Sequence, residues 1–220
     1  MSPHPTIRAV VLDFGGVLYD MRWDVAHALE AAHRLPRGAI VDTLYRTETW
    51  AAIERGRGDG EAWRVEAHRR LEERAGRSLP RLHDAWRASQ ALVPASLAAV
   101  RALRPAYRTA ILSNADISLR TRLGHAGVLP LFDAALVSAE EGIAKPEPAI
   151  YHLAATRLEV RPEACLFVDD HEPNVAAARE VGMAAHVFRL DRGHDLPRLL
   201  AEAGLLAVSP EGSRPNDSPR

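Results

Sequence analysis

The chain has 220 residues, of which 47% are hydrophobic, and its formal net charge at pH 7 is -1. These values are typical of a globular protein with one sizeable core, and they exclude an intrinsically disordered chain. The near-neutral charge argues against a nucleic acid or an anionic membrane as the partner, and the short, charge-interrupted apolar runs cannot span a bilayer. The single cysteine, Cys165, cannot form an internal disulfide, and the N-terminus lacks the long apolar segment of a signal peptide. We therefore expect a cytoplasmic protein.

The first predicted element is a buried parallel strand over residues 7–12, which runs into Asp-Phe-Gly-Gly at 13–16. The next long segment, residues 23–87, has helical periodicity and few β-branched runs, and it contains all four tryptophans. Glycine and proline interrupt this segment at residues 35–38, 56–60 and 78–80. The pattern predicts several short helices and no strand within it.

From residue 93 onward, predicted helices alternate with predicted strands. The helices are expected over 95–103, 117–126, 148–158, 173–181 and 196–203, and the strands over 108–112, 134–137, 164–168 and 184–187. This alternation predicts an α/β fold with a doubly wound, Rossmann-like parallel sheet. Because the first strand belongs to the same sheet, the helical segment is an insertion after it. We expect a core over 1–18 and 93–207, a small helical-bundle cap over 19–92, and a disordered tail over 208–220.

Open α/β sheets bind ligands outside the carboxyl ends of their strands, so the residues that follow each strand are candidates for a site. The predicted strands and the loop after the third of them deliver carboxylates, a hydroxyl, an amide and an ammonium to one edge: Asp13, Ser113, Asn114, Lys145, Asp169 and Asp170. Lys145 is the only lysine among the 28 Lys and Arg residues, so the chain has kept an ammonium at this one place.

This set of side chains suits phosphoryl transfer, which needs a nucleophile, positive charge and hydrogen-bond donors around the phosphate oxygens. Asp13 can attack phosphorus and form an aspartyl-phosphate that water then hydrolyses. Mg²⁺, held by Asp13 and Asp170 with help from Asp169, can neutralise the charge that would otherwise repel a phosphate dianion. The expected phosphate-binding groups are Gly15, Gly16, Ser113, Asn114 and Lys145. Each residue alone could instead be an ordinary turn or helix cap.

Four segments of the chain resemble motifs of the haloacid dehalogenase superfamily, in particular its phosphatase-like branch with a helical cap after the first strand. The segments are 10–18 (VVLDFGGVL), 110–116 (AILSNAD), 142–151 (GIAKPEPAIY) and 165–183 (CLFVDDHEPNVAAAREVGM). The resemblance implies the following roles: Asp13 as nucleophile, Ser113 and Lys145 as phosphate ligands, Asp170 as the main metal ligand with Asp169 beside it, and the Gly15 carbonyl as a further ligand of Mg²⁺.

The chain departs from the family pattern at Gly15, where the usual residue is a second aspartate that serves as general acid and base. Losing such a group typically costs roughly 10²–10⁴-fold in rate. We therefore expect esters whose leaving group needs little protonation, such as anomeric sugar phosphates or acyl phosphates. His171 is a candidate stand-in acid, although an exposed histidine at a helix start explains it as well.

Several alternatives stay open at this stage. A phosphomutase or a dehalogenase on the same scaffold is one, and a phosphate-binding regulatory protein with little turnover is another. The expected substrate is a small phosphorylated metabolite, a sugar phosphate in the leading hypothesis, and the chain could act as a monomer or a homodimer.

The cap is expected to select the substrate. Its aromatic residues could form walls of the pocket or only the cap's own core: Tyr19, Trp23, Tyr45 and Trp50. Arg22 and Arg46 could bind a distal anion. In the core, Asn174 is expected to position the Asp170 loop, and the acidic pair at 140–141 is expected near the lysine loop.

Overall fold

The structure is a computed structural model that describes residues 6–207. Five parallel strands form its central sheet in the order β5-β4-β1-β6-β7. Their bounds are Ala9–Leu12 for β1, Arg108–Ser113 for β4, Ala134–Val137 for β5, Cys165–Asp169 for β6 and Ala184–Val187 for β7. The predicted tail over 208–220 lies outside the described residues. Within 6–207, no helix combines the length and apolar character needed to cross a membrane.

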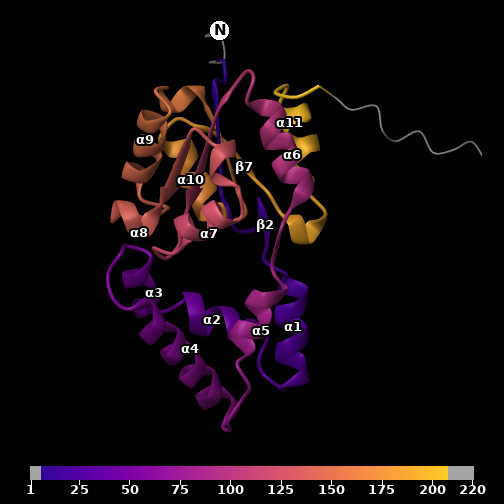
Figure 1. The fold of residues 1–220 in the computed structure, drawn as a ribbon, viewed down its shortest axis with the longest axis vertical. Coiled ribbons are helices and arrows are strands. Elements are labelled where there is room, and N and C mark those ends of the chain that lie inside the picture. Colours follow the sequence, from indigo (N-terminus) through magenta and orange to yellow (C-terminus); the bar gives the residue numbers. More distant parts are fainter. Residues whose placement is uncertain (1–5, 208–220) are drawn as a thin grey trace, which may run out of the picture.

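Alternate residues of the central strands face opposite sides of the sheet and build two hydrophobic layers. Val10 and Leu12 of β1 enter one layer, whereas Ala9 and Val11 enter the other. The first layer is covered by α6 (Pro94–Leu103), α7 (Leu119–His125) and α11 (Leu196–Glu202), and the second by α9 (Pro148–Arg157) and α10 (Glu172–Glu180). Because helices cover both faces, β1 is wholly apolar and the middle of β4 and of β6 is apolar. Figure 1 shows α6 and α11 on one side of the sheet and α9 and α10 on the other.

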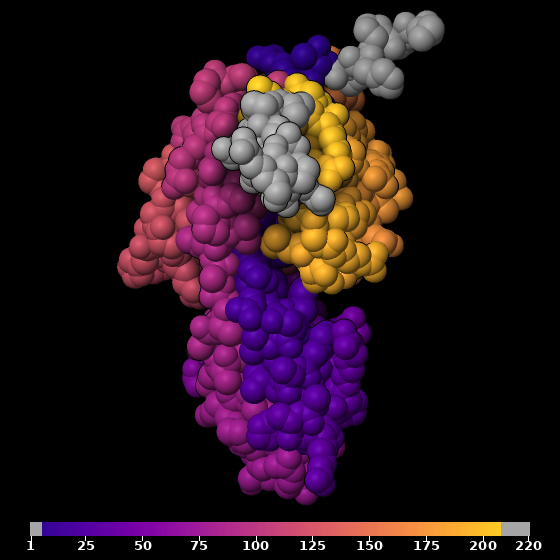
Figure 2. Space-filling view, turned by 90° about the vertical axis from the view of Figure 1, so that its right-hand side faces the viewer, coloured from indigo at the N-terminus to yellow at the C-terminus, as the bar shows by residue number. Residues whose placement is uncertain are grey.

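The chain leaves the sheet after β1 through a short strand, β2 (Tyr19–Asp20), and returns through β3 (Ala91–Leu92), which pairs with β2 antiparallel. Between them lies the helical insert, residues 21–90, with five helices: α1 (Trp23–Ala32), α2 (Ala39–Tyr45), α3 (Glu48–Ile53), α4 (Gly60–Ala75) and α5 (Leu82–Ser89). The insert has its own hydrophobic cluster. It forms a lobe at the foot of the sheet in Figures 1 and 2.

The predicted fold class is confirmed: a doubly wound parallel sheet carries a helical insert after its first strand. The strands over 134–137 and 184–187 have the predicted bounds, and β1 is two residues shorter than expected. The β2–β3 pair was not predicted from the sequence. Each strand has only two residues, which is too short to show an alternating pattern. The short helix α8 (Ser138–Glu141) and the full 16-residue length of α4 were not predicted either.

Candidate active site

The registered pairing of the three inner strands brings their carboxyl ends to one edge. Leu12, the last residue of β1, pairs with Ile111 of β4 and Val168 of β6. Asp13 directly follows β1, and Ser113 and Asp169 end β4 and β6. All three are buried, with exposed fractions of 8%, 5% and 0% respectively. The predicted strand ends therefore meet as the topology requires.

Lys145 joins two of these carboxylates. Its Nζ lies 3.0 Å from Asp13 Oδ1 and 2.6 Å from Asp169 Oδ2. Only 3% of the residue is exposed, and Nζ lies 5.6 Å from the centre of the Phe167 ring. Burial lowers the pKa of this lysine, but the carboxylates of Asp13 and Asp169 outweigh burial and raise the pKa above its usual value. The side chain is therefore a fixed cation inside the site.

Both carboxylate oxygens of Asp169 accept hydrogen bonds, so Asp169 is fixed in position and orients Lys145. In addition to the lysine, its carboxylate accepts hydrogen bonds from the His171 N–H at 2.8 Å and from Asn174 Nδ2 at 3.1 Å on each oxygen. Asn174 was expected to position the Asp170 loop, and it does contact this loop through the neighbouring carboxylate. The Asn174 carbonyl in turn accepts a hydrogen bond from the Tyr151 hydroxyl at 2.9 Å.

Asp170 reaches the site because Gly16 leaves room for it. Gly16 has a φ of +75°, and a Cβ at this position would lie 2.4 Å from Asp170 Oδ2. Its N–H donates to the Tyr19 carbonyl at 2.8 Å. This corrects the prediction that the Gly16 amide binds phosphate, since that donor is already used. Glycine is required here for the left-handed backbone and for the close approach of the carboxylate.

The carboxylates of Asp13, Asp169 and Asp170 fit a divalent cation. Their ligand oxygens lie within 4.8 Å of one another. With the Lys145 ammonium included, the cluster has a formal charge of -2, which a divalent ion would neutralise. Burial raises the pKa of Asp13 to about 7, against the lowering effect of Lys145. Burial and the Asp169 charge raise the pKa of Asp170 to about 6. Both shifts reflect, first, the burial of the charged carboxylates, which a hard cation with oxygen ligands, such as Mg²⁺, would stabilise.

The Asn114 side chain positions the lysine loop. Its Oδ1 accepts from the Lys145 N–H at 2.9 Å, and its Nδ2 donates to the Lys145 carbonyl at 2.8 Å. Asn114 was predicted to bind phosphate, but its amide group is committed to these bonds and could offer a ligand only its main-chain N–H. The second Nδ2 hydrogen goes to Glu54 Oε2, at 3.2 Å, so a residue of the insert contacts the same clamp.

A second contact ties the insert to the lysine loop. The Arg55 guanidinium forms two ion pairs, with Glu54 Oε1 at 2.8 Å and with Glu147 Oε1 at 2.8 Å. Glu147 lies two residues after Lys145 in the chain. Next to Arg55, Gly56 lies against the main chain of Ala139, where an added Cβ would be 2.2 Å from the carbonyl oxygen. The segment that follows α3 thus packs against the core close to Lys145, the candidate catalytic lysine.

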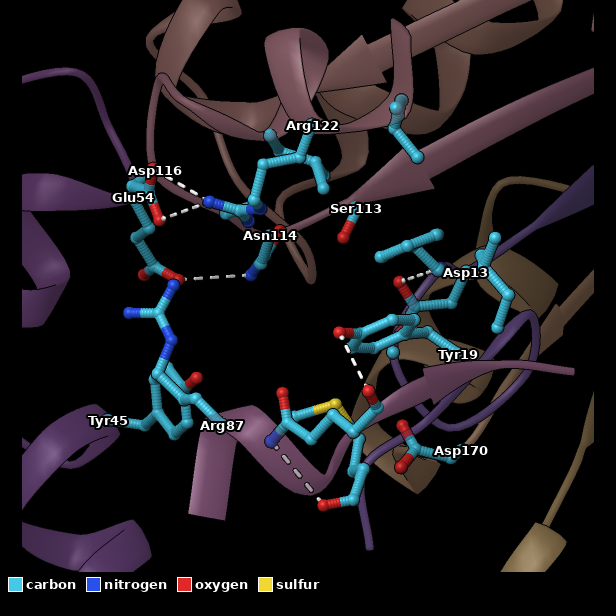
Figure 3. Close-up of a pocket in the computed structure, with 18 of the residues that line it drawn as sticks. Asp13, Tyr19, Tyr45, Glu54, Arg87, Ser113, Asn114, Asp116, Arg122 and Asp170 are labelled. Carbon is cyan, nitrogen blue, oxygen red and sulfur yellow. Dashed lines mark hydrogen bonds and ion pairs between the residues drawn. The ribbon is translucent and has the colours of Figure 1, made fainter. Parts of the chain in front are cut away.

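A cavity of about 730 Å³ connects Asp13, Ser113 and Asp170 with the insert. All four aromatic residues proposed as pocket walls line it: Tyr19, Trp23, Tyr45 and Trp50. Trp23, Tyr45 and Trp50 also pack against the insert's hydrophobic cluster, so both interpretations of these three rings hold. Figure 3 shows Asp13 and Ser113 on one side of the cavity, with Tyr45 and Glu54 on the other.

The two arginines singled out from the sequence do not line this cavity. Arg22 pairs with Asp24 at 2.9 Å, and Arg46 pairs with Asp42 at 3.1 Å. Arg87 and Arg122 line it instead. These two could not be singled out in advance, because arginine supplies almost all the positive charge of the chain. In the core, the acidic residues at 140–141 form ion pairs with two neighbouring helices. Glu140 pairs with Arg120 of α7, and Glu141 pairs with Arg157 of α9.

Gly15 and His171, the residues tied to acid and base chemistry, both line the cavity. A Cβ at Gly15 would only touch Met21, with its nearest atom, Sδ, at 3.4 Å. The space around Gly15 would therefore accept a Cβ, although the residue is glycine. His171 is exposed and precedes α10 as its N-cap residue, as expected of a histidine at a helix start.

The haloacid dehalogenase-like hydrolase family model matches residues 7–182. The chain belongs to this family. Phosphatase MT3486 of Mycobacterium tuberculosis is 32% identical over 196 residues, covering 83% of this chain and 87% of the relative. Mouse acyl-CoA dehydrogenase family member 10 is 30% identical over 84% of this chain, which spans only 18% of that longer protein. The chain likewise spans 36% of pig bifunctional epoxide hydrolase 2, to which it is 27% identical.

Solved structures of the same family share the fold. A Bacteroides thetaiotaomicron HAD family enzyme in complex with magnesium and inorganic phosphate matches with a TM-score of 0.66 and 20% identity, over 88% of this chain and 98% of that one. L-2-haloacid dehalogenase from Xanthobacter autotrophicus matches with a TM-score of 0.60 and 26% identity, over 93% and 85%. Family membership thus leaves both phosphate-ester hydrolysis and dehalogenation open.

Proposed function

We propose that the chain is a magnesium-dependent phosphatase that forms a covalent aspartyl-phosphate on Asp13. The observation that carries this proposal is the placement of Lys145 3.0 Å from Asp13, beside three carboxylates whose ligand oxygens lie within 4.8 Å. A dehalogenase needs no such excess of carboxylates, whereas a metal-assisted phosphatase does. The similarity to phosphatase MT3486 supports the same choice.

The hydrogen bonds around Asp13 define which oxygen can attack. Oδ1 is held by Lys145 Nζ and by the Phe14 N–H at 2.7 Å. Oδ2 has no hydrogen-bond partner among residues 6–207, so it is the oxygen that attacks phosphorus. The Ser113 hydroxyl faces the same cavity, and we expect it to donate to a phosphate oxygen while Lys145 offsets the developing charge.

Two displacement steps complete the reaction. In the first, the Oδ2–phosphorus bond forms and the ester P–O bond breaks, so that the leaving oxygen takes a proton from solvent. In the second, water attacks phosphorus, the Oδ2–phosphorus bond breaks, and the products are inorganic phosphate and the free Asp13 carboxylate. Mg²⁺ held by Asp13 and Asp170, with the Gly15 carbonyl as a further ligand, would supply the charge that lets a carboxylate approach a phosphate dianion.

We further propose that the α/β core, residues 1–18 and 93–207, performs this chemistry and that the cap, residues 19–92, selects the substrate. The substrate is a small phosphorylated metabolite, for which a sugar phosphate is the expectation from the sequence. The single and buried Cys165 favours a cytoplasmic location.

The test is hydrolysis of p-nitrophenyl phosphate by the wild type and by Asp13→Asn, each with and without Mg²⁺. We expect turnover only when both the metal and Asp13 are present. Absent turnover together with tight vanadate binding would support a phosphate-binding protein instead. Chloride release from chloropropionate without metal would assign a dehalogenase.

A further inference from the structure

The far end of the cavity is built from aromatic rings. Tyr45, Trp50 and Trp63 all line it, and the ring centres of Tyr45 and Trp63 each lie 4.8 Å from that of Trp50. The Trp63 indole N–H donates to the Leu44 carbonyl at 2.7 Å, so this ring has no donor left for a ligand. The insert therefore presents an aromatic surface at this end, next to the polar side chains of Glu54, Arg87 and Gln90.

Aliphatic side chains border the same cavity. Leu119 and Leu123 of α7 lie behind its surface, since each is only 1% exposed. Met21 and Leu92, next to the two chain crossings between insert and core, are partly exposed and line it. A ligand in this cavity thus meets aromatic rings of the insert and the side chains of Met21 and Leu92.

Most polar side chains at the far end already have protein partners. Asp116 lies 3.5 Å from Arg122 and accepts from the Ser118 N–H at 2.8 Å. Glu54 binds Asn114 and Arg55, as described above. Gln90 donates to the Met21 carbonyl at 3.4 Å.

Two polar groups at this end remain without a partner. Within residues 6–207, neither the Arg87 guanidinium nor the Tyr45 hydroxyl makes a hydrogen bond or ion pair with another side chain. Figure 3 shows both residues at the far side of the cavity from Asp13. Arg87 offers several N–H donors and Tyr45 a hydroxyl, so this end can bind a polar substituent of a ligand as well as an aromatic ring.

We infer that the organic part of the substrate is an aromatic ring that packs against Tyr45 and Trp50, rather than a sugar. This inference rests on the proposed phosphatase function. Gly15 is compatible with an aromatic ester, as it is with an anomeric sugar phosphate, because a phenolic oxygen can leave as a phenolate without the proton that an aspartate at position 15 would donate. An aromatic phosphate ester thus suits both the cavity and the missing acid.

The experiment compares kcat/KM at saturating Mg²⁺ for β-naphthyl phosphate, phenyl phosphate and an anomeric hexose phosphate. The two aryl esters have leaving oxygens of similar basicity, so a difference between them reports on ring binding. Burial of the second ring should favour the naphthyl ester by about tenfold, and both aryl esters should exceed the hexose phosphate. Preference for the hexose phosphate, or equal values for the two aryl esters, would overturn the inference. If none of the three were hydrolysed, the proposed function itself would fail.

A pair of variants locates the effect in the cavity. Trp50→Ala removes a ring from the lining and should reduce the naphthyl-to-phenyl ratio to near one. Leu71→Ala disturbs the same hydrophobic cluster of the insert, but Leu71 does not line the cavity. It should leave the ratio unchanged even where it lowers stability. A ratio that falls equally in both variants would count against the inference.

Discussion

At the carboxyl edge of the sheet the buried side chains are charged, and each is held by several partners, whereas the buried side chains of the helical insert are mostly apolar. Lys145 and Asp169 lie within a network of short contacts to Asp13, Asn174 and the main chain. In the insert, tryptophan and leucine fill the interior, and charges form surface pairs such as Arg64 with Glu61 at 2.6 Å. The core thus fixes charged groups in place, and the insert contributes aromatic and aliphatic packing.

This comparison predicts the largest effect at Lys145. Lys145→Met removes the cation between two buried carboxylates and should lower kcat by at least about 10³-fold, comparable to loss of a transition-state charge donor. It should also destabilise the fold by about 3–5 kcal/mol, because the carboxylates are left uncompensated. Urea unfolding and single-turnover kinetics measure the two effects.

The control for Lys145 is the double variant Lys145→Met with Asp169→Asn. It removes one of the stranded charges, so it should recover stability without recovering activity. Recovery of both would show that the lysine serves the fold and not the chemistry.

The second prediction concerns the missing acid. Gly15→Asp should raise kcat/KM for an alkyl phosphate by roughly 10²-fold, while a p-nitrophenyl ester, which needs no protonation, should change little. The substitution is feasible because an added Cβ would meet only Met21, at ordinary contact distance. Gly15→Asn is the matched control, and an equal gain from it would refute a role for proton donation.

The third prediction tests the interior of the insert through His83. This residue is 5% exposed, lies 3.0 Å from the Thr43 hydroxyl through Nε2, and has a pKa lowered by burial from 6.5 to about 4. A depressed folded-state pKa means that the unfolded chain binds the proton first as pH falls. Stability should therefore be lost between pH 6.5 and 4, by about 3 kcal/mol in total.

Urea unfolding followed by tryptophan fluorescence at a series of pH values measures this loss. His83→Gln should remove the part of the pH dependence that falls in this window. An unchanged profile in the variant would assign the dependence to other groups.

The smallest predicted effect lies where insert and core meet. Arg55→Ala breaks the contacts to Glu54 and Glu147 that tie the insert to the lysine loop. Because single ion pairs of this exposure contribute about 1 kcal/mol or less, kcat should fall only about threefold to fivefold. Arg64→Ala, which breaks a pair confined to α4, should leave kcat unchanged. Equal behaviour of the two variants would argue against coupling between the insert and Lys145.

The core was the more predictable of the two regions, because its signals are local. An apolar strand followed by a polar residue reports both the strand and the position of its end, so Asp13, Ser113 and the 169–170 carboxylates could be placed at one edge. The hydrogen-bond partners could not be predicted. Asn114 and Gly16 were expected to bind phosphate, but long-range contacts with the lysine loop and the Tyr19 carbonyl occupy the Asn114 side chain and the Gly16 N–H.

The insert resisted prediction for a related reason. Its aromatic residues could be suggested as pocket walls, but Glu54 and Arg87 could not, because only tertiary packing brings them over the sheet edge. The same holds for Arg122 of the core helix α7. Among so many arginines, composition gives no basis for choosing one. Local pattern therefore predicted which side chains meet at the sheet edge, while the lining of the cavity required the assembled structure.

Trapping the phosphoenzyme shows directly whether the Asp13 carboxylate attacks phosphorus. The enzyme would be mixed with an aryl phosphate and Mg²⁺, quenched in acid within one turnover, digested and examined by mass spectrometry. The account predicts one added phosphoryl group on the peptide that contains Asp13, absent in Asp13→Asn. A phosphoryl group on another residue, or full turnover by Asp13→Asn, would contradict it.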